Sequence, residues 1–287
     1  MNDLHQKYMK ERASLLSNLD ELIEMEQKYM SVMVNIIKEA AEDMHQDFHE
    51  FGPELLPFWR NYPPEQRGRA FRNEAIPMLE LGEKLVGSHI IKAVCHKLEN
   101  VRFPGLPTGG DIRFMTDDAF IHCDIKITGP NEVDNEVVVP PNQVSGDGEH
   151  WDAFGLRNNH WPIHYRGSRG LNFNFQPKLP PLYLAGDKRR VCLTFYIKAV
   201  YSTVEYGVHP IRHFEVVCVP NGLLMFSNGV HSYAKADGLI TSGKDEVTKD
   251  SSTRRIRVKL NPLARIANWR AVKMERQEDG WVLSHRV

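Results

Sequence analysis

The segment "FIHCDIKITG", residues 120–129, alternates apolar and polar side chains in the manner of a β-strand. Successive side chains in a strand point to opposite faces of the sheet. One face is therefore apolar and consists of Ile121, Cys123, Ile125 and Ile127. The other face places Asp124 beside Lys126. This pair has two interpretations, an ion pair on a solvated sheet or one half of a catalytic site.

Short strand patterns separated by turn residues surround this segment. They are expected at Ile112–Met115, Phe120–Thr128, Val191–Tyr201, Phe214–Val219 and Arg255–Leu260. They all follow a helical first part of the chain, and this order predicts a mostly antiparallel or mixed sheet rather than a doubly wound fold. The expected fold class is α/β, in a single domain that spans residues 1–287.

Apolar residues recur at helical spacing between residues 12 and 48, with Glu26 as one interruption. The pattern predicts one long amphipathic helix or two in succession, packed on its own core or serving as a subunit interface. Residues 51–72 contain four prolines and two glycines and are predicted to form a loop. Helical spacing resumes over residues 76–99, with Glu83 in the first half.

The composition is that of an ordinary folded protein, with 41% hydrophobic and 25% charged residues. A formal net charge of −1 argues against a histone-like or polybasic DNA binder, although a local basic patch remains compatible with it. The four cysteines are widely spaced and are expected to be reduced core thiols. No signal peptide or membrane span is recognisable, so a cytoplasmic location is expected.

A second carboxylate strengthens the catalytic interpretation of Asp124 and Lys126. Asp111 follows Gly109 and Gly110 at the start of the preceding strand, and a hairpin can bring the two carboxylates together. Neighbouring carboxylates repel unless a cation joins them, and hard oxygen ligands suit Mg²⁺. The metal would stabilise the phosphoryl transition state and the leaving alkoxide, while Lys126 would orient or acidify the attacking water. Glu83 could assist a water or a second metal.

An acidic residue two positions before a lysine is a weak signal alone, because Glu26-Gln27-Lys28 repeats it within a helix. Longer stretches are more specific. They are "PFWRNYPPEQRG", "LGEKLVGS", "GLPTGGD", "DIKITGP", "PPNQVSGDGEHW", "LPPLYL", "VPNGL" and "SGKDEVTKDSSTRRIRV". In this order they resemble the PD-(D/E)xK nucleases, and within them the BglI-like type II restriction endonucleases, over most of the chain beyond about residue 55.

The resemblance implies a central mixed sheet flanked by helices, with a catalytic core at 75–128 and a DNA-reading region at 240–260. The helical spacing separately predicts a long helical N-terminal segment at residues 1–50. It implies catalytic roles for Asp111, Asp124, Lys126 and Glu83. It places the metal at Asp111, Asp124 and Ile125. Gly110 stands where this motif usually has proline.

DNA contacts are also implied by motif position, and for several residue types the chemistry is suitable. Arginine and lysine donate to guanine, and a carboxylate accepts from cytosine. The expected DNA-binding residues are Arg69, Glu132, Lys244, Glu246, Arg255, Arg257, Asn142 and Gln143. Arg255, Arg257 and Lys259 would share one strand face, and a merely solvated face is the alternative.

The resemblance therefore predicts a Mg²⁺-dependent type II restriction endonuclease that cleaves double-stranded DNA at an interrupted palindrome. A two-fold DNA site implies a homodimer, with a tetramer as the alternative. Two other functions are compatible with the residues. One is a structure-specific PD-(D/E)xK repair nuclease, and the other is a non-catalytic DNA-binding protein with a nuclease fold.

Overall fold

The computed structural model describes residues 3–61, 78–105, 109–129, 134–149, 163–166, 172–185, 188–204, 208–227, 232–243 and 253–286. Its long helices are α1 (Asp3–Ser17), α2 (Leu19–Asn61) and α3 (Met78–Lys97). Short helical elements are α4 (Gly222–Met225), α5 (Leu260–Ile266), η3 (Pro141–Gln143), η4 (Tyr233–Lys235) and η5 (Asn268–Arg270). Among the described residues, no helix is both long and apolar enough to cross a membrane.

The sequence left open one long N-terminal helix or two in succession, and the structure has two, because α1 ends at Ser17 and α2 begins at Leu19. Buried apolar side chains such as Leu22, Ile37 and Phe48 pack α2 on the core of its own chain. The predicted loop from residue 51 is wrong over residues 51–61, where α2 continues to Asn61 through Pro53 and Pro57. The fixed φ of proline is compatible with a helix, and each proline removes one backbone donor without breaking this helix.

The central seven-stranded sheet has the order β1-β2-β7-β8-β11-β12, and β6 also pairs with β7. Its strands are β1 (Ile112–Met115), β2 (Ala119–Thr128), β6 (Leu182–Ala185), β7 (Lys188–Tyr201), β8 (Ile211–Val219), β11 (Ala271–Gln277) and β12 (Gly280–His285). The β2–β7 pair is parallel and the other pairs are antiparallel. The sheet is therefore mixed, as predicted.

A smaller sheet joins β3 (Glu136–Val139), β10 (Ile256–Lys259) and β9 (Ile240–Ser242), and β4 (Ile163–Arg166) pairs with β5 (Asn172–Phe175). The predicted strands at 112–115, 120–128, 191–201 and 214–219 correspond to β1, β2, β7 and β8. The fifth corresponds to β10, although Leu260 begins α5 instead of ending the strand.

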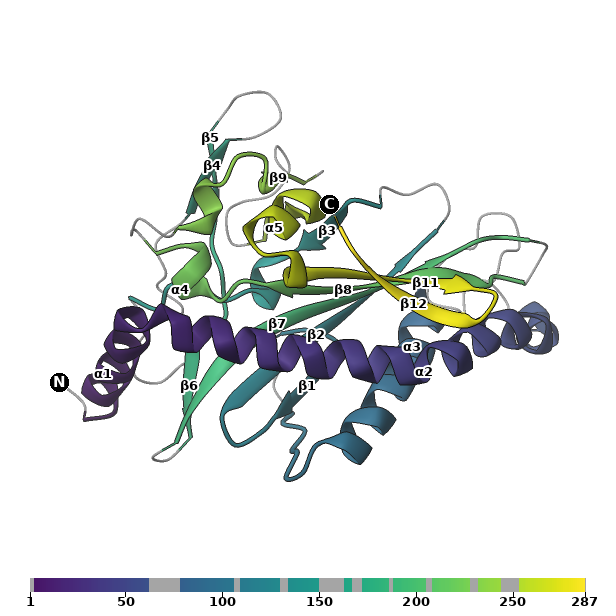
Figure 1. Cartoon of the computed structure of the whole chain (residues 1–287), viewed down its shortest axis with the longest axis horizontal. Helices are drawn as coiled ribbons and strands as arrows, with labels where there is room; N and C mark the ends of the chain where they lie inside the picture. The colour runs from purple at the N-terminus through teal and green to yellow at the C-terminus, as the bar shows by residue number, and fades with distance from the viewer. Residues whose placement is uncertain are drawn as a thin grey trace.

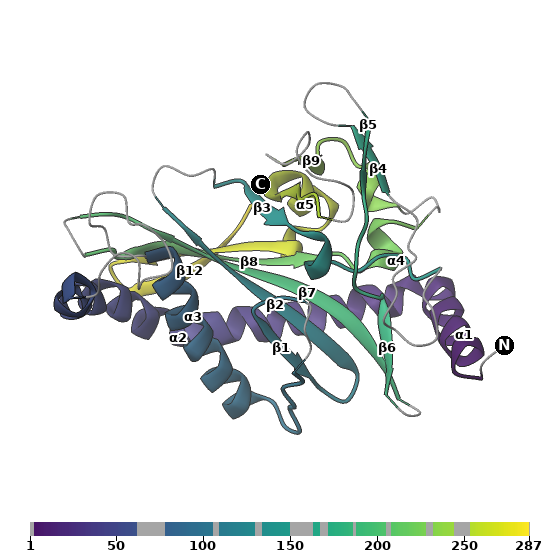
Figure 2. The ribbon, with the colours of Figure 1, turned by 180° about the vertical axis from the view of Figure 1, so that it is seen from behind.

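Two apolar layers enclose the central sheet. Helix α2 crosses one of its faces (Figure 1), and the apolar side of β2 packs there against α2 and α3. The reverse view in Figure 2 shows β3, β9 and α5 gathered beside the sheet. A second core cluster joins this group to the other sheet face and includes Tyr196, Val217 and Val258. The polar side of β2 consequently lies in the protein interior, where a charged side chain requires partners.

All four cysteines are free thiols. Cys123, Cys192 and Cys218 are buried as predicted. The prediction of a core position is wrong for Cys95, which is exposed on α3 immediately after the buried Val94.

Candidate active site

Asp124 and Lys126 lie side by side on β2 and form an ion pair between Oδ2 and Nζ. The Asp124 side chain is 2% exposed and that of Lys126 is 29% exposed. The interpretation of this pair as a solvated surface contact is therefore wrong, because the carboxylate is buried.

Asp111 is brought to the same place by the hairpin of β1 and β2, in which Ile112 lies opposite Cys123. Asp111 is exposed, and its Oδ2 accepts a hydrogen bond from the backbone N–H of Ile125 at 2.8 Å. Gly109 precedes it with a left-handed φ of 113°. The predicted convergence of the two carboxylates is present, and Ile125 contributes its backbone while its side chain packs in the apolar core.

Burial is the main influence on the electrostatics of Asp124 and raises the pKa of its carboxyl to about 7. The Lys126 ammonium opposes this effect, and the nearby Asp111 carboxylate adds to it by repulsion. Within the part of the chain that the structure describes, Lys126 is thus the one neighbouring cation that lowers the pKa of Asp124, and it lies beside two carboxylates, those of Asp111 and Asp124. A hard divalent cation would relieve the remaining repulsion, so this set of oxygen donors fits Mg²⁺.

Gln143 binds the carboxylate oxygen of Asp124 that Lys126 does not contact. It lies on η3, and its Nε2 donates to Asp124 Oδ1. The Tyr196 hydroxyl donates to Gln143 Oε1 at 3.4 Å, and Lys126 Nζ lies 5.7 Å from the centre of the Tyr196 ring. Sequence reasoning expected Gln143 to contact DNA, whereas its amide contacts the buried carboxylate. Its neighbour Asn142 is half-buried on the same turn.

Glu83 and Asp111 line one pocket of about 310 Å³ between α3 and the sheet. Its remaining lining residues are Lys84, Gly87, Ser88, Ile91, Ile112 and Ile125. Helix α3 can approach the sheet closely at Gly87 because glycine has no side chain there. A Cβ at this position would lie 3.3 Å from Ile125 Cδ1. The predicted position of Glu83 near Asp111 is therefore present.

The predicted DNA-reading residues divide into two groups. Arg69, Glu132, Lys244 and Glu246 lie outside the described residues. On β10, Ile256 and Val258 are buried as the alternation predicts. Arg255 is exposed immediately before this strand.

Arg257 is held by the protein itself. Its Nε lies 2.6 Å from Glu136 Oε1, and its Nη1 donates to the Ser242 carbonyl at 2.7 Å. Lys259 pairs with the other oxygen of Glu136. Arg257 therefore helps to hold the small sheet together, and a contact between Arg257 and DNA would have to compete with Glu136.

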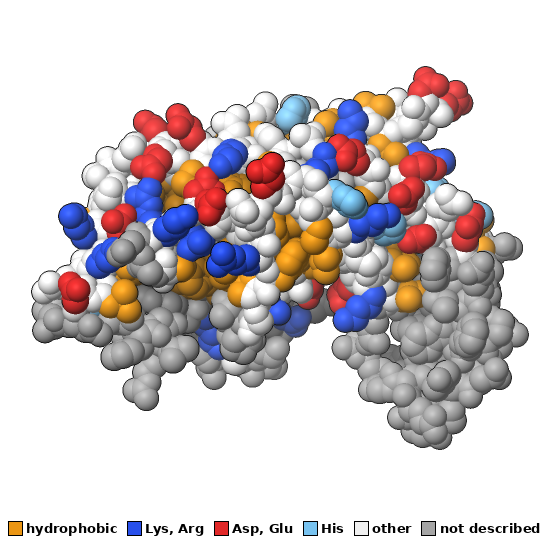
Figure 3. All heavy atoms as spheres, turned by 90° about the horizontal axis from the view of Figure 1, so that it is seen from below, with side chains coloured by type: hydrophobic (Ala, Val, Ile, Leu, Met, Phe, Trp, Pro, Cys, Tyr) orange, Lys and Arg blue, Asp and Glu red, His pale blue; other side chains and the backbone are white. Residues whose placement is uncertain are grey.

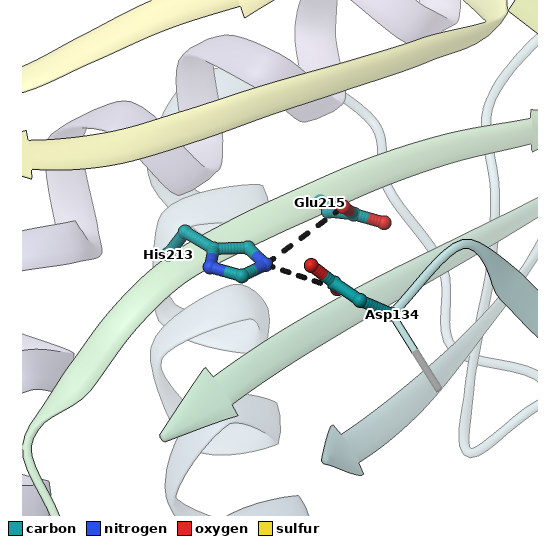
Figure 4. Close-up of side chains that lie close together, drawn as sticks. All are labelled: Asp134, His213 and Glu215. Carbon is teal, nitrogen blue, oxygen red and sulfur yellow. Dashed lines mark hydrogen bonds and ion pairs between the residues drawn. The ribbon is translucent and has the colours of Figure 1, made fainter. Parts of the chain in front are cut away.

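A second cluster of metal-ligating residue types consists of Asp134, His213 and Glu215 (Figure 4). His213 Nε2 lies 3.2 Å from Asp134 Oδ1 and 3.8 Å from Glu215 Oε1. Lys198 Nζ donates to the Asp134 carbonyl at 2.6 Å, and Arg286 pairs with Glu215. The positive charges of Lys198 and Arg286 already balance the two carboxylates. Through these contacts the cluster joins the chain before β3 to β7, β8 and the C-terminal segment. Burial lowers the pKa of His213 and raises that of Glu215.

His213, the last residue of the segment "HPIRH" (residues 209–213), is buried and hydrogen-bonded to Asp134. Sequence reasoning did not identify Asp134 or Glu215. A lone glutamate in the apolar run "FEVVCV" was the available signal for Glu215.

Gly110→Ala is expected to lower the cleavage rate by about tenfold or more. A Cβ at this position would lie 2.5 Å from the Cys123 carbonyl oxygen, so the backbone before Asp111 would have to move. An error of about 1 Å in a catalytic group costs roughly 100-fold. Gly105→Ala is the matched control, because its Cβ would meet nothing within 4 Å. Equal rates for both variants would contradict this constraint on Asp111.

Asp124→Asn is expected to stabilise the fold at pH 8 in EDTA by about 1–3 kcal/mol. The folded-state pKa of about 7 lies above the ordinary aspartate pKa of 3.8, so the folded protein binds this proton more tightly than the unfolded chain. The contribution of this carboxyl to the stability of the wild type should therefore fall as pH rises from about 4 to about 7 and then level off. Thermal unfolding should show the advantage of the variant growing over this window. A pH-independent difference would contradict the buried titration.

The chain is similar to known restriction endonucleases over most of its length. The family model "Restriction endonuclease BglI" matches residues 3–274. The chain is 34% identical over 259 residues to the type II restriction enzyme BglI of Bacillus subtilis, covering 83% of this chain and 85% of that protein. The crystal structure of BglI bound to its DNA recognition sequence matches with a TM-score of 0.82 and 30% identity, over 95% of this chain and 96% of that one.

A more distant match concerns the fold alone. The tetrameric restriction endonuclease SfiI bound to cognate DNA has a TM-score of 0.64 and 13% identity to this chain. The aligned regions cover 94% of this chain and 96% of SfiI.

Proposed function

The chain belongs to the BglI family of type II restriction endonucleases, and from this premise we propose that Asp111, Asp124 and Lys126 hydrolyse double-stranded DNA with Mg²⁺. The observation that carries this proposal is the buried Asp124 carboxylate, which lies beside Asp111 and is paired with Lys126. Site-specific DNA cleavage is the activity of the family. The assignment to these residues and the identity of the metal are the proposed parts.

The chemistry requires a water oxygen to bond to phosphorus while a phosphorus–oxygen ester bond breaks. Bound Mg²⁺, held by Asp111 and Asp124 with Ile125 beside them, would stabilise the negative charge that develops on the phosphate oxygens. Lys126 orients the attacking water with its ammonium, which is the more exposed member of the ion pair. Glu83 faces the same pocket as Asp111 and can accept a proton from water.

Gln143 acts on the carboxylate rather than on the substrate. Its amide fixes the orientation of Asp124, and the Tyr196 hydroxyl fixes the amide in turn. Residues that orient a metal ligand sharpen the geometry of a site and raise its affinity for the metal.

The proposed target is an interrupted palindrome, read by a homodimer with one active site for each DNA strand. Among the described residues, the exposed Arg255 beside β10 supports base reading. The other proposed base-reading residues lie outside the described part of the chain and are Arg69, Glu132, Lys244 and Glu246. A tetramer is the alternative assembly. Because its substrate is DNA, we place the enzyme in the cytoplasm of a prokaryotic cell.

Digestion of a plasmid, followed by sequencing of the fragment ends, tests this function. Discrete fragments whose ends share one two-fold symmetric sequence with unspecified central bases are the expected result. Cuts that follow junctions or nicks instead of sequence would indicate a structure-specific nuclease. Binding without any cleavage in Mg²⁺ would indicate a non-catalytic DNA-binding protein.

Arg255→Ala is expected to weaken binding to the target sequence by about tenfold or more and to change binding to unrelated DNA little. A bidentate contact to guanine discriminates by about 1–3 kcal/mol, whereas a phosphate contact weakens all sequences alike. The measurement is a titration of target and scrambled duplexes at two salt concentrations. Equal losses on both duplexes, with a shallower salt dependence, would make Arg255 a backbone contact.

A further inference from the structure

A second pocket lies at the turn between β1 and β2 and is here named the basic pocket. It has a volume of about 370 Å³ and is lined by Asn100, Val101, Arg102, Met115, Thr116, Asp117, Lys188 and Arg190. Three of these residues are cationic and one is acidic, so the lining carries a formal charge of 3 − 1 = +2. The whole chain has a net charge of −1, which makes this a local excess of positive charge.

Arg190 is the unusual member of the basic pocket, because it is only 8% exposed. Its Nε donates to the Thr116 carbonyl at 2.8 Å, and its buried Nη1 has no hydrogen-bond partner among the described residues. Buried charges are normally paired, because an unpaired one loses hydration without compensation. The Arg190 guanidinium therefore lacks a counter-charge that a bound anion would supply.

Of the two carboxylates of the neighbouring turn, one is held outside the basic pocket and the other pairs weakly within it. Asp118 Oδ2 pairs with Lys28 at 2.6 Å, and its Oδ1 accepts from the hydroxyls of Tyr29 and Thr116. Asp117 lies 3.4 Å from Lys188, and both side chains are more than half exposed. An exposed pair of this kind is weak and can open to admit a ligand.

Backbone hydrogen bonds fix the segments that carry the basic side chains. Arg102 and Met115 exchange two of them, at 3.1 and 2.9 Å, and Val191 N–H donates to the Asp118 carbonyl at 2.9 Å. Arg190 and Lys188 lie two residues apart on β7, opposite Tyr183 and Ala185 of β6. Figure 3 views the side of the molecule on which β1 and β6 lie and shows Lys and Arg side chains gathered there.

We propose that Arg102, Lys188 and Arg190 form a binding site for a phosphate group, separate from the catalytic carboxylates. A guanidinium presents a planar set of donors that matches phosphate oxygens, and a lysine adds a mobile point charge. The basic pocket shares no lining residue with the pocket of Glu83 and Asp111. The phosphate belongs either to the DNA backbone or to a free phosphate or phosphomonoester. This inference does not depend on the assignment of the catalytic residues.

Two titrations of the full-length protein test the site and identify the source of the phosphate. The first is calorimetric binding of inorganic phosphate, with chloride at matched ionic strength as the blank. The second is the salt dependence of binding to a duplex that contains the target sequence. Both are measured for wild type, Arg102→Ala, Lys188→Ala and Arg190→Met, after thermal unfolding has established that each variant is folded. Arg212→Ala, which removes an exposed arginine of β8 outside the basic pocket, is the control.

Phosphate binding that is weakened at least about fivefold by Arg102→Ala and Lys188→Ala, but not by Arg212→Ala, would support the site. If the salt slope of DNA binding also falls by about 1 in these variants, the source is the DNA backbone. If the slope is unchanged, the source is a free phosphate or phosphomonoester. A reduced slope without measurable binding of free phosphate supports the DNA source. Unchanged slopes together with absent or variant-independent phosphate binding would overturn the proposal. The two exposed positions keep this test valid if Arg190→Met fails to fold.

Discussion

Asp124→Asn is expected to lower the single-turnover rate of DNA cleavage by at least about 100-fold while affinity for target DNA changes less than about threefold. The substitution preserves the size of the side chain and an oxygen that can accept from Gln143. It removes the negative charge that would hold a cation beside Asp111. The measurement compares cleavage with excess enzyme in Mg²⁺ and binding to the same duplex in EDTA.

Two further variants test whether the loss of cleavage is specific to the charges of the proposed site. Asp111→Asn should resemble Asp124→Asn, because it removes the other carboxylate of the pair. Lys28→Ala should leave the chemical step unchanged, since this residue belongs to the helical copy of the motif and pairs with Asp118 on the surface. Cleavage near the wild-type rate by either asparagine variant would contradict the assignment of Asp111 and Asp124 to the active site.

Glu26→Ala is expected to destabilise the fold by about 3–5 kcal/mol. Glu26 is fully buried on α2, its Oε2 lies 2.6 Å from Arg270 Nη2, and its Oε1 accepts from the Asn221 N–H at 2.6 Å. Removing the carboxylate would leave Arg270, which is 1% exposed, without its partner. Chemical denaturation of wild type and variant provides the comparison.

A matched control lies on the same helix, where the exposed Glu24→Ala should change stability by less than about 0.5 kcal/mol. Replacing the pair by Glu26→Leu with Arg270→Met should restore much of the loss, because apolar residues of similar volume do not leave a buried charge. Similar stabilities for Glu26→Ala and Glu24→Ala would contradict the burial of this ion pair.

Local geometry explains which parts of the site were predictable from sequence. The pairing of Asp124 with Lys126 follows from the two-residue period of a strand, and Asp111 reaches them through a hairpin of adjacent strands. The contact of Gln143 with Asp124 depends instead on how the turn after β3 folds back. Residue types and spacing do not specify that path.

The same distinction applies to the fold. Long periodic segments gave α2, β2 and β7, whereas β3, β6 and β9 have three or four residues each and leave little periodicity to detect. The hairpin of β11 and β12 was missed although the pair Asp279–Gly280, which ends its turn and begins β12 with a φ of 119° at Gly280, was a recognisable signal. Glu26 stood out within an apolar stripe, but its partner lies 244 residues away and was not deducible from local pattern.

The location of the metal can be observed directly by anomalous scattering from Mn²⁺ in crystals of the protein bound to a duplex that contains its target sequence. Mn²⁺ accepts the same oxygen ligands as Mg²⁺ and provides a signal that identifies it. The account predicts an anomalous peak in contact with the carboxylates of Asp111 and Asp124. A peak at Asp134, His213 and Glu215, with none between Asp111 and Asp124, would contradict it.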